Sequence, residues 1–136
     1  MAAIAGELRF FVDESALGVA KALEISRHDV VHPGHRLLPD VPLGTLDPDW
    51  MPVVADRGLV VISRDRRIRT KPAELQAFRS HGLRAFWIAG KRDLSTWDAL
   101  VRLVRRWHDL EEVIRLRGPG PWFYSVTDDR VTGIRV

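Results

Sequence analysis

The sequence predicts an α/β sandwich built around a mostly parallel central sheet. Short apolar runs alternate along the chain with segments of helical periodicity, which is the order that βαβ units produce. The chain has 136 residues, of which 46% are apolar, so it is long and apolar enough to bury one core. We therefore expect residues 1–136 to form a single domain.

Four apolar runs have the length and composition of buried strands. They are residues 8–12, 29–31, 59–63 and 83–88. Apolar residues at helical spacing predict helices at residues 14–27, 48–56, 72–81 and 95–115. Because a helix separates each strand from the next, the strands are expected to run parallel.

The region from Ser95 onward carries the strongest helix signal and then two strand signals. Ser95 and Asp98 form a helix-capping pattern, and apolar residues such as Trp97 and Leu100 lie mostly on one helical face. The motif GPGP ends this helix. WFYSV and GIRV, on either side of the turn-like TDDR, predict two C-terminal strands.

Composition limits the classes of protein and of site. Cysteine is absent, which excludes disulfides and thiolate metal sites. The net charge of +3 permits a nucleic-acid partner but does not require one. No apolar window reaches the length of a membrane span, and the N-terminal segment lacks the basic and apolar regions of a signal peptide. We expect a cytoplasmic protein.

Three carboxylates are predicted to meet at one edge of the sheet. Asp13 directly follows the first strand, and Asp65 follows the third strand by two residues. Asp47 is expected at the N-cap of the helix that opens with Pro48. The carboxyl ends of parallel strands share one edge, and a crossover helix begins at that same edge. Each acid also has a simpler interpretation, since Asp13 and Asp47 suit helix caps and Asp65 balances nearby arginines.

A cluster of carboxylates favours a bound cation, because like charges within a few Å raise one another's pKa. Oxygen ligands without cysteine favour Mg²⁺ or Mn²⁺ over Zn²⁺. The neighbouring acids Glu14 and Asp49 could add a further oxygen to the three predicted ligands. Glu74 could as well, because Pro72 opens another helix at this edge.

Three histidines surround a Pro- and Gly-rich segment, residues 32–47, which predicts a long loop. They are His28, His32 and His35. Without a cysteine or glutamate partner at metal-binding spacing, we interpret them as polar loop residues rather than as a zinc site.

Basic side chains fill the connection that follows the third strand. They are Arg64, Arg66, Arg67, Arg69 and Lys71. Phosphodiester chemistry requires a metal ion beside such cations, because the ion activates water while the cations hold neighbouring phosphates. We therefore expect this connection to bind the phosphates of a nucleic acid. The alternative is a solvated loop held by local Asp–Arg pairs.

Several motifs in this order resemble PIN-like domains, and most closely the branch of VapC-like toxins. The motifs are RFFVDES, GLVVISRDRRIR with KPAE following, LRAFWIAG and GPGPWFYSV, which span nearly the whole chain from Leu8. The resemblance implies a three-layer sandwich, acidic residues that hold Mg²⁺ or Mn²⁺, and endoribonuclease activity. It also implies a type II toxin–antitoxin pair in which a cognate antitoxin covers the site.

In this resemblance Asp13 matches the first acid, Asp47 the acid that opens the intervening helix, and Asp65 the acid after the central strand. A fourth acid, usual in PIN domains, is not evident, and the candidates are Asp93, Asp98 and Glu74.

The expected function is hydrolysis of RNA phosphodiester bonds by a metal-dependent ribonuclease. One alternative is a non-catalytic PIN-like module that binds nucleic acid or protein, which the missing fourth acid supports. Another is a phospho-receiver, with Asp13 and Glu14 on the metal, Asp65 phosphorylated and Lys91 bridging. Against the receiver, the chain is one βα unit short and continues into C-terminal strands. Formation of a homodimer stays open.

Overall fold

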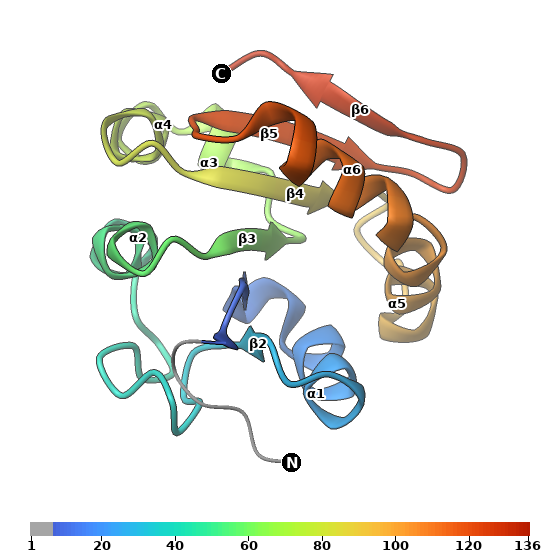
Figure 1. Ribbon diagram of the computed structural model, residues 1–136, viewed down its shortest axis with the longest axis horizontal. Coiled ribbons are helices and arrows are strands. Elements are labelled where there is room, and N and C mark those ends of the chain that lie inside the picture. Colours follow the sequence, from blue (N-terminus) through green and yellow to red (C-terminus); the bar gives the residue numbers. More distant parts are fainter. Residues whose placement is uncertain (1–6) are drawn as a thin grey trace.

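The structure is a three-layer α/β sandwich, described for residues 7–136 by a computed structural model (Figure 1). Within these residues the central sheet has six strands in the order β2-β1-β3-β4-β5-β6. The first five run parallel, and β6 is antiparallel to β5, which confirms the predicted fold class. The strands are β1 (Phe10–Val12), β2 (Val30–Val31), β3 (Val60–Ser63), β4 (Arg84–Ile88), β5 (Trp122–Val126) and β6 (Val131–Ile134).

Helices cover both faces of the sheet. The 3-10 helix η2 (Glu14–Ala16) leads into α1 (Leu17–Ser26). The other helices are α2 (Asp47–Asp56), α3 (Arg67–Thr70), α4 (Pro72–Ser80), α5 (Thr96–Arg105) and α6 (Trp107–Arg117). In Figure 1, α2 and α4 lie to the left of the sheet, and α1 and α5 lie to the right.

Alternate residues of the same strands build two separate cores, because successive side chains of a strand point to opposite faces. Phe10 and Ile62 belong to the core that α1, α5 and α6 cover. Phe11 and Val61 belong to the core that α2 and α4 cover, where Phe11 packs against Trp50 with ring centroids 4.7 Å apart. Burial on both faces explains why these strands read as continuous apolar runs.

The predicted helix at residues 95–115 is two helices. Arg106 leaves the helical conformation, with φ −98° and ψ 6°, and it separates α5 from α6. The break allows α6 to lie across the sheet, where Trp107 packs against Phe10 with ring centroids 4.9 Å apart. Tertiary packing, which the local sequence does not reveal, therefore sets this boundary.

Two further boundaries differ from the prediction. The basic connection after β3 contains the short helix α3, which is anchored by the buried side chain of Ile68. The last strand begins at Val131 rather than at Gly133, because the turn closes directly after β5 with Thr127 N–H donating to the Arg130 carbonyl (3.0 Å).

The expectation about a signal peptide concerns mainly residues 1–6, which lie outside the described residues. In the part of the chain that the structure describes, no helix has both the length and the apolar character needed to cross a membrane.

Candidate functional site

Five carboxylates line one cleft of about 550 Å³ at the carboxyl edge of the sheet. This acidic cleft is defined by Asp13, Glu14, Asp47, Asp65 and Glu74. Strand β1 lies between β2 and β3, so the chain order reverses beside Asp13, which is where open α/β sheets bind ligands. The acids that the sequence places at this edge therefore do meet. Asp49 is exposed on α2 and does not line the cleft.

Asp13 is the most deeply buried of these acids, with 3% of its surface exposed. Its Oδ1 accepts hydrogen bonds from the Ser15 N–H (3.1 Å) and from the Ser15 hydroxyl, and its Oδ2 accepts one from the Ser63 hydroxyl (2.6 Å). Burial raises the pKa of Asp13 to about 7, against the opposing effect of the two serines. The carboxylates of Asp47 and Asp65 make smaller contributions to this increase. A nearby cation would reverse this shift.

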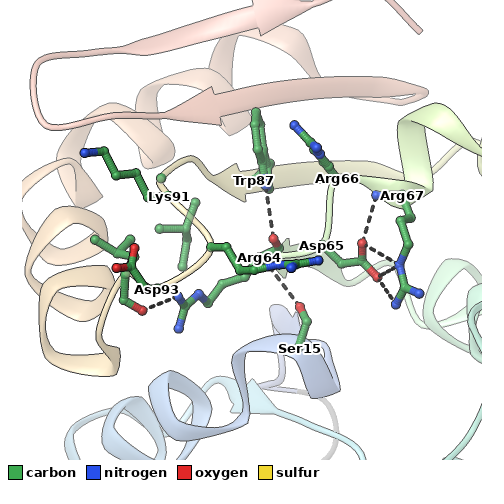
Figure 2. A pocket seen from close by; sticks show the side chains of 12 residues that line it. Ser15, Arg64, Asp65, Arg66, Arg67, Trp87, Lys91 and Asp93 are labelled. Atoms are coloured by element: carbon green, nitrogen blue, oxygen red, sulfur yellow. Dashed lines mark hydrogen bonds and ion pairs between the residues drawn. The ribbon is translucent and has the colours of Figure 1, made fainter.

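Asp65 is held by its neighbour Arg67. The Arg67 guanidinium contacts both carboxylate oxygens at 2.7 to 2.9 Å, and the Arg67 N–H donates to Oδ1 at 2.8 Å. Partial burial acts to raise the pKa of Asp65, but the bonds to Arg67 outweigh it and the pKa is lowered. Figure 2 shows the Asp65 carboxylate turned toward Arg67 and away from Arg64.

Asp47 is the first residue of α2, and Leu46 occupies the N-cap, so the prediction of Asp47 as the N-cap is wrong by one position. The Asp47 Oδ1 instead accepts a hydrogen bond from the indole N–H of Trp50 (2.9 Å). This bond ties the carboxylate to a side chain three residues further along the same helix. The Trp50 ring is buried, so it gives Asp47 a fixed support.

Of the three candidates for a fourth acid, Glu74 is the one that lines the acidic cleft. It lies in the first turn of α4, and its Oε2 is buried without a hydrogen-bond partner among the described residues. Burial and then the Asp47 carboxylate raise the pKa of Glu74, while Lys71 lowers it. Neither Asp93 nor Asp98, the other candidates, lines the cleft. The sequence pointed to Glu74 because Pro72 opens a helix at this edge of the sheet.

Glu14 lies at the rim of the acidic cleft. Its side chain is exposed, and its Oε1 accepts a hydrogen bond from the Gly44 N–H (2.6 Å). This contact ties the long loop after β2 to the start of η2. Glu14 therefore has a structural partner in addition to its position at the cleft.

A basic pocket of about 880 Å³ adjoins the acidic cleft (Figure 2). Its cations come from the ends of β3 and β4, and Ser15, Asp65 and Arg67 line both hollows. The cations are Arg64, Arg66, Arg67, Lys91 and Arg92. The two hollows thus form one continuous surface, acidic on one side and basic on the other.

Four of the five basic residues predicted after the third strand line one or both of these hollows, and Arg67 lines both. Arg64 and Arg66 line the basic pocket, Lys71 lines the acidic cleft, and Arg69 lines neither. Lys91 and Arg92 were missed as partners of the basic connection. The signal that could have identified them is GKR directly after the fourth predicted strand, at the same edge of the sheet. Lys91 does not line the acidic cleft, where the phospho-receiver interpretation requires it.

Arg64 is held in place by the segment just before α5. Its guanidinium donates to the Leu94 carbonyl, and its own carbonyl accepts a hydrogen bond from the Trp87 indole N–H (3.2 Å). Trp87 also lines the basic pocket. The pocket therefore combines a fixed arginine with further cations and one aromatic side chain.

Comparison with known proteins places the chain in a family. A family model described as "PIN like domain" matches residues 8–90, which is more than half of the chain and contains all five acids of the cleft. The chain belongs to this family of PIN-like domains, whose fold is of the nuclease type. No curated protein and no solved structure matched the chain.

The residues of the acidic cleft fit the divalent metal ion that PIN domains typically use. Glu74 offers a buried oxygen without a partner, and the Arg67 guanidinium already brings a positive charge among the carboxylates. The lining contains carboxylates and hydroxyls but neither histidine nor cysteine. Such an oxygen donor set suits a hard cation.

Proposed function

We propose that the protein is an endoribonuclease that depends on Mg²⁺ or Mn²⁺ and hydrolyses RNA phosphodiester bonds. Asp13, Asp47, Asp65 and Glu74 would hold the metal, with Glu14 at the rim. The observation that carries the proposal is the meeting of carboxylates from four separate segments of the chain in a cleft that shares a wall with a basic pocket. Membership in the PIN-like family supports a nuclease, and the likeness to VapC-like toxins supports RNA as the substrate.

The protein's side chains have distinct tasks in this reaction. A bound Mg²⁺ or Mn²⁺ would activate water and stabilise charge on the leaving oxygen. Ser15 and Ser63 orient Asp13, and Trp50 orients Asp47. The cations of the basic pocket neutralise phosphates of the bound strand, which positions the scissile bond over the cleft.

The test is a pair of matched substitutions on one helix. Asp47→Asn removes a carboxylate from the cleft, and Asp49→Asn removes one from the exposed side of the same turn. We expect Asp47→Asn to lower Mg²⁺-dependent RNA cleavage by at least about 10- to 100-fold, since even outer partners of metal ligands have effects of this size. Asp49→Asn should cleave as the wild type does.

Circular dichroism on both variants controls for folding. Equal loss of activity in both variants, or full activity in Asp47→Asn, would contradict the proposed site.

We further propose that the protein is the toxin of a type II toxin–antitoxin pair. A cognate antitoxin would cover the acidic cleft and the basic pocket together, because they form one surface. Co-expression with the adjacent small open reading frame should give a stable complex without ribonuclease activity. Failure of any neighbour to bind, together with normal growth when the free protein is expressed, would refute the toxin assignment.

The Arg67–Asp65 ion pair favours a second candidate, a non-catalytic PIN-like module. In a protein that has lost its metal, this arginine would compensate the acidic charge permanently. Thermal unfolding distinguishes the two, because a ligand that binds only the folded state raises its stability. The nuclease should be stabilised by Mn²⁺, whereas the module should not respond.

A further inference from the structure

Three side chains outside the acidic cleft form a second cluster of potential metal ligands. Glu24 projects from α1, His32 directly follows β2, and His35 lies in the long loop. One ligand atom from each lies within 4.8 Å of the others. The Nε2 atoms of His32 and His35 lie 3.1 and 3.2 Å from the two oxygens of Glu24. None of the three lines the acidic cleft.

The hydrogen bonds of His32 create a place for a cation. Its Nδ1 lies 2.8 Å from the Pro33 carbonyl, which can only accept, so Nδ1 carries a proton. In the neutral ring, Nε2 then presents a lone pair to a carboxylate oxygen of Glu24 at 3.1 Å. Two acceptors at this distance require a positive charge between them, either a second proton or a metal ion. The His32 side chain is 2% exposed, so water provides little compensation.

The surroundings of His32 also match those of a metal ligand. Metal-binding histidines commonly donate their second ring N–H to a backbone carbonyl, which fixes the ring and directs the other nitrogen to the metal. His32 Nε2 lies 3.1 Å from one Glu24 oxygen and His35 Nε2 lies 3.2 Å from the other, close to the ligand separation of about 3.3 Å in a tetrahedral zinc site with bonds of about 2.0 Å. One ligand atom from each of the three residues fits within 4.8 Å, so small side-chain shifts would bring all three onto one ion. Glu24 is partly exposed, which leaves access for a water as the fourth ligand.

His35 must exchange one hydrogen bond to complete the site. Its Nδ1 accepts from the Leu37 N–H (3.0 Å), so its Nε2 carries the proton that faces Glu24. Coordination through Nε2 would place this proton on Nδ1 instead, and the Leu37 N–H would then need water as its partner. Leu37 lies in the long loop rather than in a strand, so this change does not disturb the sheet.

We propose that Glu24, His32 and His35 bind one transition-metal ion, with Zn²⁺ the favoured ion. Two imidazoles and one carboxylate suit Zn²⁺ and not Mg²⁺, which takes oxygen ligands. The bound ion would fasten the loop after β2 to α1. Because this loop leads through Gly44 to Asp47, the ion would stabilise one wall of the acidic cleft without taking part in the reaction.

Equilibrium dialysis of the full chain against Zn²⁺, followed by elemental analysis, tests the proposal. We expect one Zn²⁺ per chain in the wild type, retained when excess Mg²⁺ is present. Glu24→Gln and His35→Ala should each weaken Zn²⁺ binding by more than the roughly 10- to 100-fold effect of an outer partner. His28→Ala, which removes an exposed histidine beside the same strand, should bind Zn²⁺ as the wild type does.

Asp65→Asn separates this site from the acidic cleft. This variant should keep its Zn²⁺ while its affinity for Mn²⁺ falls, so failure of the proposed nuclease site would leave the zinc result unchanged. The absence of stoichiometric Zn²⁺ in the wild type would overturn the proposal, as would equal binding by Glu24→Gln. Co²⁺ substitution provides a second readout, because a tetrahedral site gives intense visible absorption that should disappear in His35→Ala.

Discussion

The side chain of Asp13 brings together burial, two serine hydroxyls and two neighbouring carboxylates. Its raised pKa of about 7 means that the metal-free folded protein holds a proton there at pH values below about 7. A bound divalent ion favours the charged carboxylate and releases this proton. The local structure thus links the protonation of one residue to occupancy of the cleft.

The sign of this linkage can be tested without metal. Between the ordinary pKa of 3.8 and about 7, folded Asp13 is protonated while the unfolded chain has released its proton. The free energy of unfolding should therefore fall as the pH rises through this window. We expect Asp13→Asn to lose the part of this pH-dependent decrease that Asp13 causes. Thermal unfolding measured at several pH values with chelator present would show the loss. Glu74, whose pKa is also raised, contributes with the same sign, and Asp65 contributes with the opposite sign.

Asp49→Asn is the control for this measurement, because its side chain is exposed outside the cleft. An Asp13→Asn variant with the pH profile of the wild type would show that Asp13 does not titrate in this range.

Arg67 competes with the metal for Asp65. Its side chain is 63% exposed, so the ion pair adds little stability, and the pair must open if Asp65 is to bind the proposed metal ion. Arg67→Ala should therefore bind Mn²⁺ more tightly than the wild type in calorimetric titration. The same variant should bind RNA less tightly, because it has one cation fewer to neutralise a phosphate. Weaker binding of Mn²⁺ by Arg67→Ala would contradict this competition.

At the level of elements, the two connections that follow β3 and β4 act together. One supplies Arg64 and Arg66 and the other supplies Lys91 and Arg92, so the basic pocket depends on the parallel pairing of these strands. The sequence predicts both strands, but it does not show how far each connection extends over the edge. The cations after β4 were therefore missed, although both strands were predicted correctly.

Salt dependence measures the contribution of each connection. For single-stranded RNA, the slope of log K against log salt changes by about 0.7 for each phosphate that the protein no longer neutralises. Arg66→Ala and Lys91→Ala should each flatten the slope by about this amount. Arg79→Ala, an exposed arginine of α4 outside both hollows, should leave it unchanged. An unchanged slope for Lys91→Ala would remove the connection after β4 from the interface.

Across the whole molecule, topology is what the sequence predicted best. Apolar runs alternating with helices predicted the parallel sheet, and the parallel sheet brought Asp13, Asp47 and Asp65 to one edge. Contacts between distant segments were harder to predict. The break at Arg106 depends on how α6 packs on the sheet, and the role of Glu74 depends on the spacing between α2 and α4.

The histidine cluster shows the same limit. The sequence showed three histidines without a glutamate at a recognisable metal-binding spacing, because the end of α1 and all of β2 separate Glu24 from His32 and His35. Only the packing of α1 against the loop after β2 brings its carboxylate to both rings.

Anomalous scattering from crystals soaked in Mn²⁺ would locate the ion on which the proposed activity depends. We expect a peak among the carboxylates of Asp13, Asp47, Asp65 and Glu74, with the Arg67 guanidinium displaced from Asp65. In chelator-treated crystals the peak should disappear and the ion pair should form again. A cleft without a peak at saturating Mn²⁺, with Arg67 still bound to Asp65, would contradict the proposal that this protein is a metal-dependent nuclease.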